Sequence, residues 1–209
     1  MDIQLVVKNI VVIGDFIPQK FDKYFFLKNN IFEENEILET SIFLPEFCVL
    51  QTSFVTVQIT SQQLIINDIN TDKFYDMTSL TKKIIEYSDL LASAAGVNFH
   101  FYKFSKDDTQ NLSKKYFYNE NNLINKFFDG DDVNYGYYIS KNFDDARLKL
   151  DIKPATVQNL ESNVSEKLIQ FQFNFHVDFQ TNSKDKLFSV IENYERYYEE
   201  AKKIITIYE

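Results

Sequence analysis

The clearest pattern in the chain is an alternation of apolar and polar residues over positions 166–180. The apolar positions are Phe171, Phe173, Phe175, Val177 and Phe179. Because successive side chains of a strand point to opposite faces, this alternation predicts a strand with one buried face and one polar face. Shorter apolar runs predict further strands at residues 2–13, 41–69 (two or three strands), 97–104 and 135–157.

Two segments repeat apolar residues at spacings of three and four, which is typical of a helix with one buried face. The first covers residues 77–95, where Asp76 is suited to cap the start and Gly96 to end the helix. The second covers residues 184–208, and its apolar positions are Leu187, Ile191, Tyr194, Tyr198, Ala201, Ile205 and Tyr208. Residues 16–40 predict a loop with short elements. The polar residues 105–134 predict a long excursion with a short helix near 123–128.

Together these elements predict an α+β protein. We expect a largely antiparallel sheet, with the two long amphipathic helices packed on its Phe-lined face. A single domain over residues 1–209 is the simplest organisation. The triplet Asn-Phe-His occurs at 98–100 and again at 174–176, which suggests two pseudo-repeated halves, about 1–104 and 135–209, joined by 105–134. Chance in a chain rich in Asn and Phe is the simpler source of three matched residues.

The charge of the chain narrows the classes of partner. The net charge is −9, and Arg147 and Arg196 are the only arginines. An acidic surface repels phosphate backbones and anionic lipids, and arginine forks that read phosphate are nearly absent. Direct binding to nucleic acid or to a membrane is therefore disfavoured.

Composition also indicates the compartment. Cys48 is the only cysteine, so no intrachain disulfide forms. Asp2 stands where a signal peptide carries basic residues, and the longest apolar run, Ile10–Ile13, is far too short to span a membrane. We expect a cytoplasmic protein. The abundance of Asn, Ile, Lys, Phe and Tyr is typical of an AT-rich genome, such as that of a bacterium or phage, and carries no chemistry.

Candidate chemistry is sparse. If the strands that carry His100 and His176 are neighbours, both rings project from the polar face and form, with Asp178, a two-histidine, one-carboxylate set. Hydrogen-bonded imidazoles on a sheet surface are the plainer interpretation. Cys48 lies in an apolar segment that favours an inert thiol. Neither a nucleophile motif nor metal-ligand spacing is present, so we expect no catalytic residue, no metal and no cofactor.

Three functional hypotheses follow. The leading one is a non-enzymatic protein that binds another protein or a second copy of itself, using tyrosines of the terminal helix, namely Tyr194, Tyr197, Tyr198 and Tyr208. The alternative is a purely structural role, in which this helix covers the Phe-lined sheet and the hydroxyls of its tyrosines reach water.

The second hypothesis is an acidic inhibitor, encoded by a mobile element, that imitates nucleic acid. The carboxylates that would line its surface are Glu33, Glu34, Glu36, Asp129, Asp131 and Asp132. The third is a protein that binds a small ligand or metal on the polar sheet face, through His100, His176 and Asp178.

Overall fold

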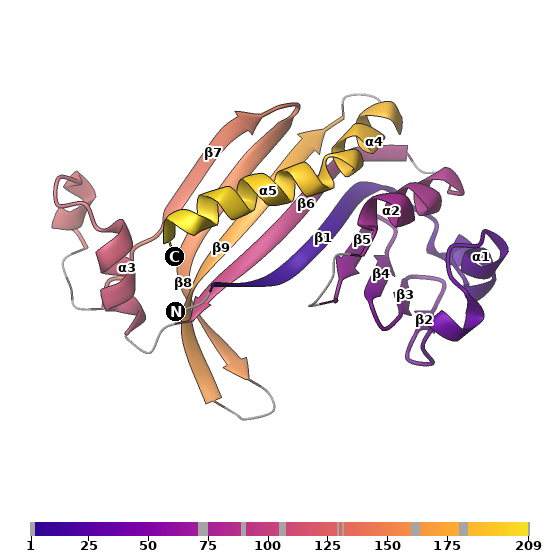
Figure 1. Cartoon of the computed structure of the whole chain (residues 1–209), viewed down its shortest axis with the longest axis horizontal. Coiled ribbons are helices and arrows are strands. Elements are labelled where there is room, and N and C mark those ends of the chain that lie inside the picture. The colour runs from indigo at the N-terminus through magenta and orange to yellow at the C-terminus, as the bar shows by residue number, and fades with distance from the viewer. Residues whose placement is uncertain are drawn as a thin grey trace.

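The computed structural model describes residues 3–70, 75–88, 91–104, 108–128, 130, 132–159, 164–179 and 184–208. Its centre is an antiparallel sheet of nine strands, and helices α2, α4 and α5 lie across one face of that sheet (Figure 1). The prediction of a mixed α+β protein with a largely antiparallel sheet is confirmed.

The sheet joins strands from both ends of the chain. The strands are β1 (Ile3–Asp15), β2 (Ile42–Phe43), β3 (Cys48–Gln51), β4 (Val55–Ile59), β5 (Gln63–Asp68), β6 (Leu91–Phe104), β7 (Tyr137–Phe143), β8 (Ala146–Asn159) and β9 (Val164–Asp178). Their order across the sheet is β2-β3-β4-β5-β1-β6-β9-β8-β7, and each neighbouring pair is antiparallel. The predicted region 41–69 thus supplies four strands, and 135–157 supplies most of a hairpin.

The helical elements connect and cover these strands. They are η1 (Pro18–Lys20), α1 (Lys23–Lys28), η2 (Glu34–Glu36), α2 (Met77–Glu86), α3 (Thr109–Phe117), η3 (Leu123–Lys126), α4 (Lys184–Glu192), α5 (Tyr194–Ile205) and η4 (Thr206–Tyr208). The short elements expected within 16–40 and near 123–128 are therefore present.

The alternating strand behaves as its sequence predicts. Phe171, Phe173 and Phe175 are at most 1% exposed, and their polar neighbours face the opposite side. The register with β6 places Phe173 opposite Phe99 and Phe171 opposite Phe101, so the rings of the two central strands form one apolar surface. Burying a Phe side chain stabilises the fold by about 1.5–3 kcal/mol, and this surface is the centre of the core.

Helix α5 covers this surface with tyrosine rings. The ring of Tyr197 stacks on Phe175 with centroids 4.4 Å apart and an interplanar angle of 10°. The rings of Tyr194 and Tyr198 also pack against Phe99, with centroids 5.3 and 5.4 Å from the Phe99 centroid. The terminal helical region therefore packs on the Phe-lined face, as expected.

The first predicted helix is shorter than expected. It spans Met77–Glu86, with the carboxylate of Asp76 accepting a hydrogen bond from the Ser79 amide at 2.9 Å. Residues 91–95 instead begin β6, where they pair with β1 and β9. Alanine favours helices, but pairing on both sides outweighs a propensity of a few tenths of a kcal/mol per residue. Gly96 is accordingly a strand residue and not a helix cap.

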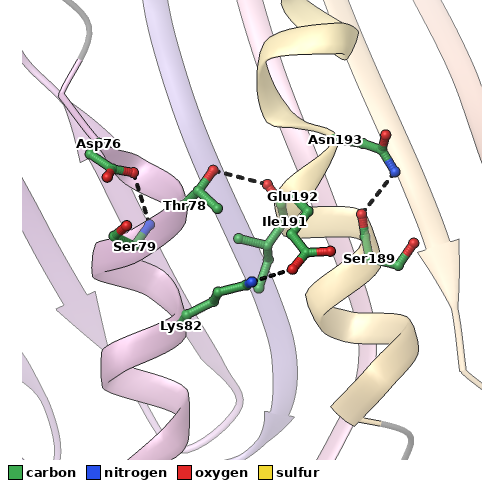
Figure 2. A network of polar contacts seen from close by, with 8 residues as sticks. All are labelled: Asp76, Thr78, Ser79, Lys82, Ser189, Ile191, Glu192 and Asn193. Carbon is green, nitrogen blue, oxygen red and sulfur yellow. Dashed lines mark hydrogen bonds and ion pairs between the residues drawn. The ribbon is translucent and has the colours of Figure 1, made fainter.

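The second predicted helix is divided in two at Asn193, so a single long helix over 184–208 was wrong. The side-chain amide of Asn193 donates to the Ser189 carbonyl at 2.9 Å, and such a bond competes with the helical backbone (Figure 2).

Helix α2 contacts the end of α4, just before the division at Asn193. The hydroxyl of Thr78 donates to the Ile191 carbonyl at 3.2 Å, and Lys82 forms an ion pair with Glu192 (Figure 2). These contacts fasten the end of α4 to α2.

None of the helices in the described part of the chain has the length and apolar character needed to cross a membrane.

Candidate functional site

The structure separates the residues of the predicted two-histidine site. His176 and Asp178 lie together near the end of β9, with the Nε2 atom 2.8 Å from the carboxylate Oδ1. His100 projects from the same face of β6, but its register partner is Gln172, four residues before His176. At about 3.3 Å per residue, the two histidine positions are roughly 13 Å apart along the strands. The geometry brings His176 to Asp178 and leaves His100 apart.

A row of asparagines lies between the two histidines. Asn67, Asn9, Asn98 and Asn174 are direct register partners on β5, β1, β6 and β9. Each side-chain amide donates to the next carbonyl oxygen: Asn9 to Asn67 at 3.1 Å, Asn98 to Asn9 at 2.7 Å and Asn174 to Asn98 at 2.6 Å. Asn67 continues the row by donating to the Thr56 hydroxyl at 3.1 Å.

This amide row stabilises the polar face from within. A buried or half-buried amide that is hydrogen-bonded contributes about 1 kcal/mol, and the row links five strands at one level. Gly96 lies beside it, and a Cβ atom there would meet the Asn174 amide nitrogen at 3.2 Å. The repeated Asn-Phe-His triplet was the sequence signal for this row, because it supplies Asn98 and Asn174. Asn9 and Asn67 carried no such signal.

His100 is held in a neutral form. Burial, and secondarily the positive charge of Lys153, lower the pKa of His100 below its ordinary value. A ring of this kind accepts or donates a hydrogen bond but carries little charge at neutral pH.

Metal binding finds no support in the described residues, where no three His, Cys, Asp or Glu side chains gather closely enough to hold an ion. Burial also raises the pKa of the Cys48 thiol to about 12, so the nucleophilic thiolate is not formed near neutral pH.

The tyrosines predicted as an interface divide into two groups. Tyr194 and Tyr197 are buried in the core, whereas Tyr198 and Tyr208 are half-buried. The Tyr208 ring packs 4.9 Å from Phe171 and contacts Tyr116 and Phe117. While these contacts hold, Tyr194 and Tyr197 are not accessible to a partner, and their role as interface residues stays a prediction.

Sequence reasoning missed a buried ion pair. Lys8 and Asp68, on the helix-covered face of β1 and β5, are 3.0 Å apart, and the Asp68 side chain is fully buried. The carboxylate also accepts hydrogen bonds from the Asn70 and Tyr75 amides at 2.9 and 3.1 Å. Because its oxygens are occupied, we interpret this pair as structural. No local sequence pattern marks it, because the two residues come from separate strands.

A second missed feature is an apolar cavity. A cavity of about 290 Å³ opens where the end of β1 meets η1, α1 and the end of α2. Phe16, Phe21 and Phe25 line it, and Tyr87 and Leu91 stand exposed at its rim. The sequence predicted only a buried strand and a turn here, because the rings come from segments that the fold brings together.

A third feature is a group of exposed apolar side chains, which we name the η3 patch and define as Leu123, Ile124, Phe127 and Phe128. Phe127 is 82% exposed and Leu123 is 73% exposed. The patch follows α3, and this segment stands away from the sheet on the side of the molecule where α3 lies (Figure 1). The hydroxyl of Tyr135 donates to the Phe128 carbonyl at 3.4 Å and so connects the patch to the segment that enters β7.

The acidic clusters are dispersed in the described residues. Glu34 pairs with Lys23 at 2.9 Å, and Glu33 and Glu36 form a reciprocal cap of η2. Asp132 is exposed on a turn, while Asp129 and Asp131 lie outside the described residues.

Comparison with known proteins adds no relationship: the sequence matches no protein-family model, and a search of curated proteins finds no match.

The lowered pKa of His100 predicts a dependence of stability on pH. Below about pH 6.5 the unfolded chain protonates this ring more readily than the folded chain, so the free energy of unfolding falls as pH drops through that value towards the lower folded pKa. Urea denaturation of the wild type and of His100→Gln, compared between pH 7.5 and 5, measures the difference. We expect the wild type to lose more stability than the variant; equal losses would contradict the assignment.

Proposed function

We propose that this chain acts by binding another protein, and that the η3 patch is part of the contact surface. The observation that carries the proposal is the exposure of four large apolar side chains within six residues. Single exposed apolar residues are common, but a clustered group is typical of an interaction site. Two phenylalanines on such a patch are also suited to act as anchors in a partner's pocket.

Other surfaces support the proposal less. The apolar stripe of α5 is used against the sheet, and its outward side carries charged residues such as Glu195, Glu199 and Lys202. Self-association through this helix stays a prediction, because the described outward side of α5 offers no apolar surface to a second copy. The imitation of nucleic acid is also less favoured, because described acids such as Asp108, Glu200 and Asp144 form ion pairs with nearby cations.

A variant of the η3 patch tests the proposal. Affinity purification from the native host, followed by mass spectrometry, should recover a partner with the wild type. Phe127→Ser combined with Phe128→Ser should reduce the recovered partner at least tenfold, since apolar anchors carry most of the binding energy of an interface. Tyr24→Ser removes a similarly exposed ring on α1, 67% exposed, and is the matched control.

The control should retain the partner at the wild-type level, and all variants should unfold at the same temperature. Recovery of the same proteins in the same amounts by the double variant would overturn the role of the patch. A wild-type chain that recovers no partner would overturn the proposed function itself.

The cavity of about 290 Å³ favours a second function, the binding of a small aromatic molecule. Its three phenylalanine rings offer an apolar lining, while Asp15, Lys20 and Ser88 supply the polar part of that lining. This arrangement, mostly apolar with a few polar groups, is typical of small-molecule sites.

A thermal-shift titration with p-cresol tests this second function. A ligand that binds only the folded chain raises the unfolding temperature, and a concentration of about one hundred times Kd stabilises by about 2.7 kcal/mol. Leu91→Asp places a carboxylate at the rim and should abolish the rise, whereas Leu38→Asp, at an exposed leucine elsewhere, should not. No rise with the wild type, or an equal rise with Leu91→Asp, would refute the site.

A further inference from the structure

Strand β7 is an open edge of the sheet. It pairs with β8 from Tyr137 to Phe143 without a register shift, and no described strand pairs with its other side (Figure 1). Alternate residues of such a strand direct their N–H and C=O groups outward. Among the described residues, no backbone hydrogen bond outside the sheet involves this strand.

The two edges of the sheet differ. Strand β2, at the opposite edge, has only two residues, which is one of the ways in which proteins prevent pairing with another chain. Strand β7 has seven residues and contains neither proline nor a bulge. It therefore offers a template on which an extended segment can form hydrogen bonds.

The side chains of β7 define what each face of an added strand would meet. Tyr137 and Ile139 lie on the helix-covered face, and Ile139 is exposed there. Tyr138, Ser140 and Asn142 lie on the polar face, where Ser140 is the register partner of Lys149. On the helix-covered face an added strand meets mainly apolar groups, together with Lys141, which is paired with Glu200 at 2.6 Å; on the other face it meets polar groups.

The polar face near this edge is positively charged. Arg147 on β8 reaches over β7: its guanidinium donates to the side-chain oxygen Oδ1 of Asn142 at 2.9 Å and to the Ser140 hydroxyl at 2.5 Å. Lys149 and Lys153 lie on the same face of β8, and Asp151, paired with Lys153 at 2.7 Å, is the acid among them. The three cations and one acid on this face of β8 leave a charge of +2, in a chain whose net charge is −9. On the same face of β9, Asp178 lies 2.8 Å from His176.

The positive charge on the polar face of β8 determines which kind of segment can pair with β7. A second copy of the chain would bring its own Arg147 and Lys149 to the same face, and like charges across an interface oppose binding. A segment with acidic side chains on that face would instead pair with Arg147 and Lys149.

We infer that β7 accepts an extended segment of the partner protein, and that this segment alternates acidic residues on the polar face with apolar residues on the helix-covered face. The inference rests on the proposed function, because it names the chemistry of the same partner at the strand that follows the η3 patch in the chain.

A synthetic peptide of alternating glutamate and valine, nine residues long and fluorescently labelled, probes this edge. Fluorescence polarisation should show saturable binding to the wild type that weakens at least tenfold between 50 and 500 mM salt, on the order expected when exposed charges are screened. A peptide with lysine in place of glutamate should bind at least tenfold more weakly. Arg147→Gln should weaken the binding of the glutamate peptide, whereas Lys167→Gln, on the distant arm of β9, should not.

A pair of proline variants tests the backbone pairing. Of two adjacent residues in an edge strand, one directs its N–H to the neighbouring strand and the other directs it outward. One of Ile139→Pro and Ser140→Pro should therefore lower the unfolding temperature, while the other should leave it unchanged and abolish peptide binding. Ser140→Ala keeps the N–H and should bind the peptide as the wild type does.

Two results would overturn the inference: wild-type binding by the folded proline variant, or equal binding of the glutamate and lysine peptides. If the peptide does not bind although recovery of a partner still depends on Phe127 and Phe128, then the inference fails and the proposed function stands.

Discussion

The contact between the tyrosines of α5 and the phenylalanines of the two central strands is the interaction on which the rest of the structure depends. The stacked rings of Tyr197 and Phe175, and the rings of Tyr194 and Tyr198 on Phe99, fix the helix to the middle of the sheet. Because β6 and β9 are neighbours, strands from the N-terminal and C-terminal halves of the chain join in one sheet there. One face of the sheet is committed to the core, and the other is left to polar groups.

This division has a consequence for function. The polar face looks like a binding surface in the sequence, but much of its hydrogen-bonding capacity is used by the amide row of Asn67, Asn9, Asn98 and Asn174. The register of β6 and β9 also places His100 and His176 too far apart to act together at one site. The surfaces that remain available are at the periphery: the η3 patch, the open edge of β7 and the apolar cavity beside α1.

Periodicity predicted what depends on local pattern. The alternation around Phe173 identified the buried face of β9, and the three-and-four spacing identified the helices that cover it. It did not predict the division at Asn193, where the side-chain amide takes the Ser189 carbonyl. It also assigned residues 91–95 to a helix, because Leu91 and Ala94 fit a helical spacing, while pairing with β1 and β9 decides their conformation.

The candidate sites were harder to predict, since each joins segments distant in sequence. The amide row needs four strands in register, and the cavity needs Phe16, Phe25 and Leu91 to meet in space. The exposure of Phe127 could not be predicted from the sequence, because most phenylalanines of this chain lie in the core. Only the order of the strands shows that β7 is an edge, and only the register places Arg147 over it.

Residue-resolved amide hydrogen exchange tests the central claim most directly. If the tyrosine–phenylalanine contact organises the sheet, the amides of β6 and β9 exchange slowest, through global unfolding. Those of β7 alternate between protected and rapidly exchanging residues along an open edge. Amides of β9 that exchange as fast as those of β2, or uniform protection along β7, would contradict the account.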